Sequence, residues 1–411
     1  MSLFLVNAFY LPPGLVGLLS GTKMGEGSMQ EFQFNTTPGI RFGAGFGQAL
    51  TAEVVAHLGP RVLFVTDKGL RGIGLTDAAL AALSDGHVTI FEDVEADPSL
   101  ATLMAATDAG REAGVTGVIG FGGGSSMDVA KLAALLLGSD EDLDAAWGVG
   151  NAKGPRLPLV LVPTTAGTGS EVTPISIITV GGEEKRGVSS PVILPDLAIL
   201  DPELTRGLPA PVTAATGIDA MVHAIEAYTS KSANNNPMSR LLAVEALQKL
   251  GRNIERAVHH GDDLAARGEM LLGSMLAGMA FANSPVAAVH ALAYPIGGIF
   301  HIPHGLSNAL VLAQVMRFNA PVCAQAYGEL APHVFPDIAQ NATQETCAAF
   351  IEGMAALSER CGLPQRLRDV DIPKDALPRM ASEAMKQTRL LVNNPREVTE
   401  MDALNIYEAA W

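Results

Sequence analysis

The pattern of apolar residues changes once along the chain, at Leu208–Pro211, and this change limits the folds that the sequence can adopt. Before it, helical patterns alternate with short apolar runs that indicate strands, namely Arg61–Thr66, Val88–Phe91, Val115–Phe121 and Leu157–Val162. Such alternation predicts a parallel sheet covered by helices. After it, only long helical windows rich in Ala, Leu and Met follow, beginning with Thr213–Ser230 and Pro237–His259. We therefore expect an α/β domain at residues 31–209 and an all-α C-terminal domain at residues 210–411.

The length and composition of the chain favour a two-domain protein with a small-molecule site and argue against binding to nucleic acid or membranes. A chain of 411 residues is too long for one ordinary core, and the cleft between two domains is a usual place for a small-molecule site. The apolar fraction of 48% suits a large interior with subunit contacts, so we expect a homodimer or larger homo-oligomer. The net charge of −16 would repel nucleic acid and anionic membranes, and we expect neither as a partner. Three cysteines without a Cys-x-x-Cys pair fit a reducing cytoplasm.

The first 30 residues differ from the rest of the chain. The apolar stretch Leu3–Leu19 is interrupted by Pro12, Pro13 and Gly14, and no Lys or Arg precedes it as in a signal peptide. It is also short for a membrane span. We expect residues 1–30 to be a poorly ordered extension, or the true start to be Met29. An anchor for a membrane or a partner is the remaining alternative.

A glycine-rich turn separates a predicted strand from a predicted helix; its residues are Gly122, Gly123, Gly124 and Ser125. A strand, a glycine turn and a helix start let the backbone approach a phosphate, and the helix N-terminus offers free N–H groups. The spacing is not Gly-x-Gly-x-x-Gly, because Met127 occupies the last glycine position, so a tight turn without a ligand is the alternative. Asp128 lies in the first helical turn, where the helix dipole alone favours an acid.

Three further features have the chemistry of cofactor contacts. Asp67 follows a predicted strand, where a carboxylate can accept from the ribose hydroxyls of NAD and repel the 2′-phosphate of NADP. Helix capping explains Asp67 about as well. The loop Pro163–Glu171 carries four hydroxyls and two glycines, which fits either a cofactor loop or an ordinary polar turn. Lys185 lies in the hydrophilic stretch Gly181–Arg186, where a solvated loop cation is the simpler interpretation.

Four candidate metal ligands lie in the helical half: Asp219, His223, His290 and His304. Asp219 and His223 are four residues apart in a helical segment and therefore share one face. A carboxylate buried on that apolar face needs a partner or a metal. Each histidine alone is more often a core residue, but the four together predict a divalent metal site. Oxygen and imidazole ligands without a thiolate suit Fe(II), Zn(II), Co(II) or Mn(II).

Over residues 31–411 the chain resembles the iron-containing (group III) alcohol dehydrogenase family. The resemblance rests on residues 122–128, residues 163–171, the pair Asp219 and His223, and the block from His290 to His304. It implies a Rossmann-like α/β domain followed by a helical domain, an architecture shared with dehydroquinate synthase. It further implies Fe(II), or else Zn(II), held by Asp219, His223, His290 and His304. NAD is the implied cofactor, with contacts assigned to Asp67, Gly122, Gly123, Gly124, Ser125, Asp128, Thr164, Thr165, Thr168 and Lys185.

The activity that the resemblance implies is NAD(H)-linked, metal-dependent interconversion of a small alcohol and its aldehyde or ketone. His290, His304 and Tyr294 are the expected catalytic residues. Tyr294 is a departure, because many members of the family carry a histidine at that position, and a phenol is a poorer proton shuttle near neutral pH than an imidazole. The alternative within enzymes is an NADH-dependent reductase of a small oxo-acid, similar to maleylacetate reductase. Outside enzymes, the alternative is a nucleotide-binding module without turnover.

Overall fold

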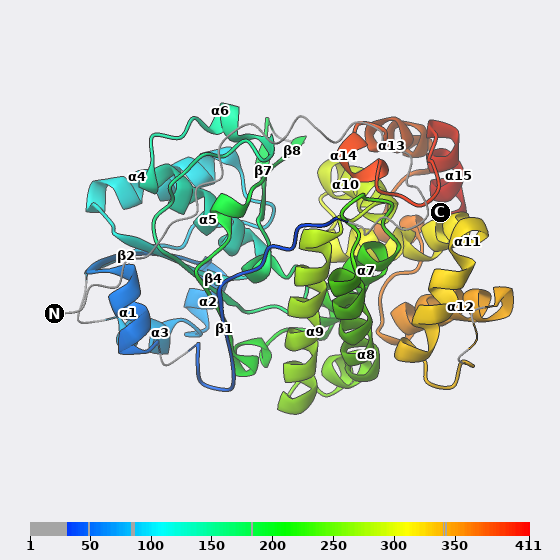
Figure 1. Ribbon diagram of the computed structural model, residues 1–411, viewed down its shortest axis with the longest axis horizontal. Helices are drawn as coiled ribbons and strands as arrows, with labels where there is room; N and C mark the ends of the chain where they lie inside the picture. The colour runs from blue at the N-terminus through cyan, green and yellow to red at the C-terminus, as the bar shows by residue number, and fades with distance from the viewer. Residues whose placement is uncertain (1–30, 48–49, 84–86, 182–183, 340, 342) are drawn as a thin grey trace.

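The computed structural model has an α/β half and a helical half, drawn on the left and right of Figure 1. It describes residues 31–47, 50–83, 87–181, 184–339, 341 and 343–411. The prediction for residues 1–30 lies outside this described part. A parallel sheet in the first half and helices alone in the second confirm the predicted fold class.

All neighbouring strands of the main six-stranded sheet are parallel. In spatial order they are β1 (Gly39–Phe42), β9 (Leu197–Leu200), β6 (Leu159–Pro163), β4 (Gly117–Gly122), β2 (Arg61–Val65) and β3 (His87–Phe91). The chain runs outward from β2 to β3 and then returns past β2 to β4, so the direction of strand addition reverses between β2 and β4. In open α/β sheets, ligands bind at the carboxyl ends of the strands beside such a reversal. Asp67 follows β2 and the glycine turn follows β4, so both lie at this position.

The central strands of the main sheet, β2, β4, β6 and β9, are buried on both faces, as their apolar sequences predict. Leu63 and Val65 of β2 belong to one core, which includes residues of α4 (Leu100–Ala113) and α5 (Gly124–Gly138). Val62 and Phe64 belong to the core on the other face, which includes residues of α1 (Ala52–Leu58) and α3 (Asp77–Ala82). Two short helices, α2 (Lys68–Gly72) and α6 (Leu143–Ala146), complete this half. The glycine turn is thus held between a buried strand and a buried helix.

A second, three-stranded sheet was not predicted from the sequence. It contains β5 (Gly148–Val149), β8 (Glu184–Ser189) and β7 (Ile175–Val180), with β8 parallel to β5 and antiparallel to β7. The assignment of Lys185 to a loop is therefore wrong, because Lys185 lies in β8 opposite Thr179. Charged residues have a low strand propensity, and three of them begin β8, which hid the strand.

The helical half is built around α7 (Ala210–Thr229), which packs against α8 (Pro237–His259), α9 (Leu264–Asn283) and α11 (His304–Val334). The other helices are α10 (Ala288–Phe300), α12 (Gln344–Arg360), α13 (Leu377–Ala384), α14 (Thr388–Leu391) and α15 (Glu400–Ala410). Residues of α7 from Gly217 to Ala227 are all buried, so Asp219 and His223 lie in the interior. In the described chain no single helix is long and apolar enough to cross a bilayer; only α9 and α10 together, bent by 107°, reach that length and composition.

Candidate functional site

The four predicted metal ligands converge from three helices. Asp219 and His223 lie one turn apart on α7, His290 lies in the first turn of α10, and His304 is the first residue of α11. One donor atom from each of them lies within 4.8 Å of the others. Three of the four are buried, and the side chain of His304 is 38% exposed. The cluster is therefore accessible from the side of His304.

The chemistry of these donors fits a divalent metal. Burial lowers the pKa of His223 to about 3, so this imidazole is neutral at pH 7, as a metal ligand must be. Burial raises the pKa of Asp219, but the three neighbouring histidines and the hydrogen bond from Asn308 together outweigh it and keep the group a carboxylate. Nδ1 of His223 is buried and has no hydrogen-bond partner among the described residues. One carboxylate and three imidazoles are a donor set that Fe(II) or Zn(II) accepts.

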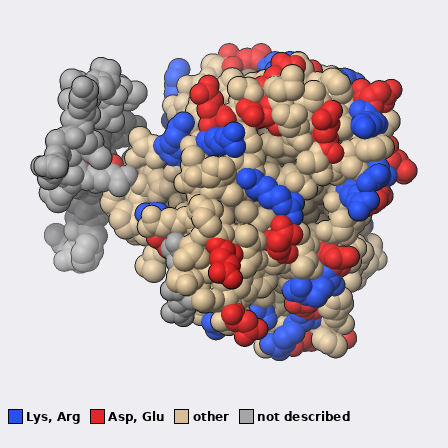
Figure 2. Space-filling model, turned by 90° about the vertical axis from the view of Figure 1, so that its right-hand side faces the viewer, with Lys and Arg blue, Asp and Glu red and all other residues tan. Residues whose placement is uncertain are grey.

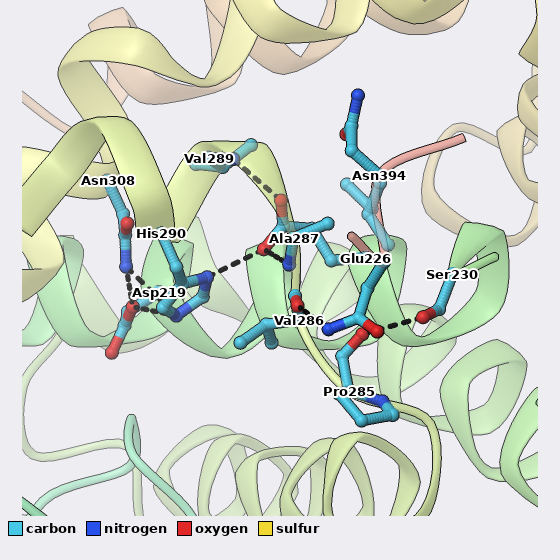
Figure 3. Close-up of polar contacts among 12 residues, drawn as sticks. Asp219, Glu226, Ser230, Pro285, Val286, Ala287, Val289, His290, Asn308 and Asn394 are labelled. Atoms are coloured by element: carbon cyan, nitrogen blue, oxygen red, sulfur yellow. Dashed lines mark hydrogen bonds and ion pairs between the residues drawn. The ribbon is translucent and has the colours of Figure 1, made fainter. Parts of the chain in front are cut away.

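Glu226 determines which nitrogen of His290 carries the proton (Figure 3). Its carboxylate accepts hydrogen bonds from the backbone N–H groups of Ala287, at 2.9 Å, and Val289, at 2.7 Å. Nδ1 of His290 lies 2.7 Å from Oε2 of the same carboxylate. A carboxylate can only accept, so Nδ1 must be the protonated nitrogen, and Nε2 is left for the cluster. Sequence reasoning missed Glu226, although it lies three residues after His223 on the same helical face.

Replacing Glu226 by Gln is expected to weaken metal binding by about 10- to 100-fold. The side-chain amide of the new Gln places an NH2 donor beside three groups that donate to Glu226, namely the N–H groups of Ala287 and Val289 and Nδ1 of His290. The tautomer of His290 is then no longer fixed. Competition with a chelator of known affinity would measure the change in Kd. The control is Glu329→Gln, which alters a carboxylate that accepts from Tyr228 at 2.6 Å, outside the cluster. Equal Kd values for the Glu226→Gln variant and the unmodified protein would contradict the role of Glu226.

Asn308 is a second residue that sequence reasoning missed. It lies one turn after His304 on α11, and its Nδ2 donates to Oδ1 of Asp219 at 2.5 Å (Figure 3). The same atom lies 3.3 Å from Nε2 of both His290 and His304. Asn308 therefore contacts three of the four candidate ligands and orients the carboxylate of Asp219. Its spacing of four residues from His304 is the signal that could have identified it.

Two glycines of the turn, Gly122 and Gly124, have no space for a side chain. A Cβ atom on Gly122, where φ is +153°, would lie 2.6 Å from Oγ of Ser126. A Cβ on Gly124 would lie 2.8 Å from Cγ2 of Thr168. The loop that follows β6 therefore packs directly against the turn, which brings the predicted residues Thr165 and Thr168 beside Gly123 and Gly124. The backbone N–H of Thr164 also donates to the carbonyl oxygen of Gly122 at 3.0 Å.

Asp67 lies beside the same turn and also caps a helix. Its Oδ1 accepts from the backbone N–H of Leu70 at 2.9 Å, which is the capping role that the sequence left open. Leu70 in turn lies 3.4 Å from the position of a Cβ on Gly122. The strand ends that carry Asp67 and the glycine turn are thus adjacent, at the reversal of strand order. A contact of Asp67 with a ribose stays a prediction.

The two oxygens of Asp128 are both bonded within the protein. Oγ of Ser170 donates to Oδ1 at 2.7 Å, and the backbone N–H of Ile177 donates to Oδ2 at 2.9 Å. Asp128 therefore joins α5 to the loop after β6 and to β7, and it also lines a cavity that extends to the histidine cluster. Lys185 lines that cavity too, and only 13% of its side chain is exposed. Its Nζ pairs with Oδ1 of Asp97 at 2.7 Å, so the interpretation as a solvated loop cation is wrong.

Two buried ionisable side chains beneath the loop, those of Lys131 and Glu171, were also missed. Lys131 is fully buried, and its Nζ donates to Oγ of Ser170 and the carbonyl oxygen of Ile175, both at 2.7 Å. Burial lowers the pKa of Lys131 to about 8. Glu171 is 1% exposed, and its Oε1 has no hydrogen-bond partner among the described residues. Burial raises the pKa of Glu171 to about 7, although the charge of Lys131 opposes the shift.

Replacing Glu171 by Gln is expected to stabilise the protein at pH 7 and above and to have little effect near pH 4. In the folded protein the pKa of Glu171 is raised to about 7, whereas the ordinary pKa of a glutamate side chain, which applies to the unfolded chain, is 4.5. Ionisation therefore destabilises the fold progressively as the pH rises from 4.5 to 7, by at most about 3 kcal/mol. Melting temperatures of both proteins across this range would measure it. A difference that does not change with pH would contradict the raised pKa.

One cavity of about 230 Å³ connects the glycine turn with the histidine cluster. Its polar wall includes Gly124, Ser125, His290, Tyr294 and His304, and its apolar wall includes Phe281, Val286, Ile302 and Leu390. Tyr294 lies one turn after His290 on α10, with its ring centre 6.1 Å from that of His304. The three predicted catalytic residues therefore share this cavity with the start of α5. A ligand that lies along it contacts both the turn and the cluster.

Two family models match the chain in succession. The model for iron-containing alcohol dehydrogenase matches residues 37–202, and the model for the C-terminal part of the Fe-containing alcohol dehydrogenase family matches residues 213–411. Among curated proteins, long-chain-alcohol dehydrogenase 1 of Geobacillus thermodenitrificans is 41% identical, over 87% of this chain and 91% of that protein.

Solved structures agree with these matches. A structure of 1,3-propanediol oxidoreductase superposes with a TM-score of 0.88 and 34% identity, covering 93% of this chain and 100% of that one. Sulfoacetaldehyde reductase from Bifidobacterium kashiwanohense, solved in complex with NAD+, gives a TM-score of 0.82 at 28% identity, with 92% and 98% coverage. The similarity therefore extends over nearly all of the described chain.

Proposed function

The chain belongs to the iron-containing alcohol dehydrogenase family, and on that premise we propose that it interconverts a small alcohol and its aldehyde or ketone with NAD(H). The observation that supports this most is the single cavity between the glycine turn and the cluster of Asp219 and three histidines. Hydride transfer needs the nicotinamide and the reacting carbon in contact, and one continuous cavity allows that contact.

Asp219, His223, His290 and His304 would hold the metal, with Fe(II) as the first choice and Zn(II) as the alternative. When bound, the metal supplies a Lewis acid for the substrate oxygen and NADH supplies the hydride. Glu226 keeps Nε2 of His290 unprotonated toward the cluster, and Asn308 orients the carboxylate of Asp219. The apolar side chains Phe281 and Val286 in the cavity wall exclude water from the reacting groups.

Tyr294 would exchange a proton or a hydrogen bond with the substrate oxygen. Its side chain lines both the cavity and a surface groove beside it, and Lys185, Arg186 and Lys386 also line this groove. This position supports a catalytic role for Tyr294 beside His290 and His304. The phenol can donate its hydrogen to an oxygen atom of the substrate during reduction and regain it from the groove.

The cofactor would lie along the reversal of strand order. Gly122–Ser125 and the N-terminus of α5 would bind its pyrophosphate, and Thr164, Thr165 and Thr168 would line it. Asp67 would accept from the ribose, while Asp128 and Lys185 would lie near the nicotinamide end of the cavity. We propose residues 31–209 as the cofactor-binding domain and residues 210–411 as the metal-binding domain. The change from strand β9, which ends at Leu200, to helix α7, which begins at Ala210, supports this division.

Oxidation of NADH at 340 nm would test the proposal directly, with anaerobically purified, Fe(II)-loaded protein. The substrates are short aldehydes, ketones and oxo-acids, and a chelator-treated sample is the control. We expect chelator-sensitive reduction of aldehydes. Protein that holds its metal and yet reduces no carbonyl compound would refute the catalytic assignment.

We also propose a cytoplasmic homodimer or larger assembly that binds neither nucleic acid nor membranes. The apolar side chains of Ile40 and Phe42 on edge strand β1 are about 40% exposed, and an edge of this kind favours pairing with a second subunit. The net charge of −16 and the interspersed acidic and basic side chains in Figure 2 are unsuited to a polyanion. Light scattering on the purified protein would measure the assembly, and a monomer would contradict it.

A further inference from the structure

Arg389 lies where the cavity meets an open groove on the surface. It belongs to α14, and its Nη2 donates to the hydroxyl oxygen of Tyr294 at 3.2 Å. Its guanidinium carbon lies 5.9 Å from the centre of the Tyr294 ring. Both side chains line the cavity that contains His290 and His304, and both also line the outer groove. Arg389 is therefore accessible both to a molecule bound at the cluster and to solvent.

The other cations of this groove are neutralised by acidic partners. The pairs are Lys185 with Asp97 at 2.7 Å, Arg186 with Glu184 at 2.8 Å and Lys386 with Glu383 at 2.7 Å. Arg389 forms no ion pair with a carboxylate of the described residues, and its side chain donates to Tyr294 instead. Its contact with Tyr294 is with a neutral oxygen. The positive charge of Arg389 thus has no ion-pair partner among the described residues at the entrance of the cavity.

A guanidinium group has five N–H donors and binds a carboxylate or similar oxyanion through two parallel hydrogen bonds. Tyr294 uses only one of the Arg389 donors. We propose that Arg389 binds an anionic group at the far end of the substrate, an inference that rests on the proposed function. The preferred substrates are then aldehydes, and the corresponding alcohols, that carry a carboxylate or another oxyanion.

The rest of the cavity wall suits such a molecule. Ile302 and Leu390 give it apolar surface that can contact a short hydrocarbon chain. The carbonyl lies at the histidine cluster, the chain lies against the apolar wall, and the anion reaches Arg389. An uncharged aldehyde of the same length leaves the guanidinium without its partner, which is how a polar pocket discriminates between analogues.

The test compares two four-carbon substrates, 4-oxobutanoate and butanal, with Fe(II)-loaded protein and NADH. We expect a higher kcat/KM for 4-oxobutanoate. In the Arg389→Gln variant, the ratio of the two kcat/KM values is expected to fall by about 10- to 100-fold, because one charge-assisted contact is lost. Arg186→Gln is the matched control, since Arg186 lines the same groove but is paired with Glu184, and it should keep the ratio of the unmodified protein.

Three results would overturn the inference. The first is a preference for butanal, or an unchanged ratio in Arg389→Gln. The second is an effect of Arg389→Gln confined to the KM for NADH, which would assign Arg389 to the cofactor. The third is an equal fall of the ratio in Tyr294→Phe, which would show that Arg389 acts only through Tyr294. Failure to reduce either substrate refutes the proposed function as well, whereas reduction of both with an unchanged ratio refutes only the role of Arg389.

Discussion

Replacing Asp219 by Asn is expected to lower kcat/KM for aldehyde reduction by about 1000-fold or more, since the Lewis acid contributes several kcal/mol to such reactions. The substitution keeps the shape of the side chain and its ability to accept from Asn308. It removes the only anionic ligand of the four in the cluster. We therefore expect the fold to persist and the bound metal to be lost. Metal analysis and steady-state kinetics on the same preparation measure both effects.

The matched control for this prediction is Asp262→Asn, which removes an exposed carboxylate of the same half of the chain. It should keep both the metal and the activity. If Asp219→Asn lost its metal and still reduced aldehydes at the normal rate, the metal would have no part in turnover. A variant that held its metal with normal affinity would instead show that Asp219 is not a ligand.

Replacing Gly124 by Val is expected to raise the KM for NADH by about 10-fold or more, the equivalent of one lost hydrogen bond to a charged group. The added Cβ would lie 2.8 Å from Cγ2 of Thr168, so either Thr168 or the turn must move. The added side chain also lies where the backbone would approach the pyrophosphate. Metal affinity should stay unchanged, because the candidate ligands lie on α7, α10 and α11 and the atoms nearest to a Cβ on Gly124 all belong to Thr168.

Gly207→Val is the control for the glycine turn, because a Cβ at Gly207 meets no atom within 4 Å. Calorimetric titration with NADH separates cofactor binding from turnover. Normal NADH binding by a folded Gly124→Val variant would mean that the cofactor does not approach this turn. Weakened binding together with a comparable loss of metal would indicate a general disruption instead.

Much of the fold could be predicted because its apolar patterns are local. The strands β2, β3, β4 and β6 lie within about two residues of their predicted positions, and α8 has the predicted bounds Pro237–His259. The hairpin of β7 and β8 could not be predicted in this way. Its second strand begins with Glu184, Lys185 and Arg186, and its position depends on pairing with β7 rather than on a buried apolar face.

Some residues of the candidate site could also be predicted from local sequence patterns, and others could not. The four predicted ligands lie in recognisable motifs, and the structure brings them together. Glu226, Asn308 and Lys131 were missed because their roles depend on contacts between distant parts of the chain. Glu226, for example, contacts a histidine 64 residues away, and Lys131 contacts a serine 39 residues away. Helical spacing could have suggested Glu226 and Asn308, but no local pattern shows that Lys131 is buried.

The hydrogen bonds from Ala287 and Val289 to Glu226 limit local unfolding at the start of α10. The N-cap residue of α10 makes no side-chain hydrogen bond to the start of the helix. The carboxylate of Glu226, which lies on α7, accepts from the first N–H groups of α10 instead. The same carboxylate holds the ring of His290. The first turn of α10 therefore cannot fray without releasing that imidazole. Exchange of the Val289 amide hydrogen with solvent should thus require the opening of the whole helical core rather than the end of one helix.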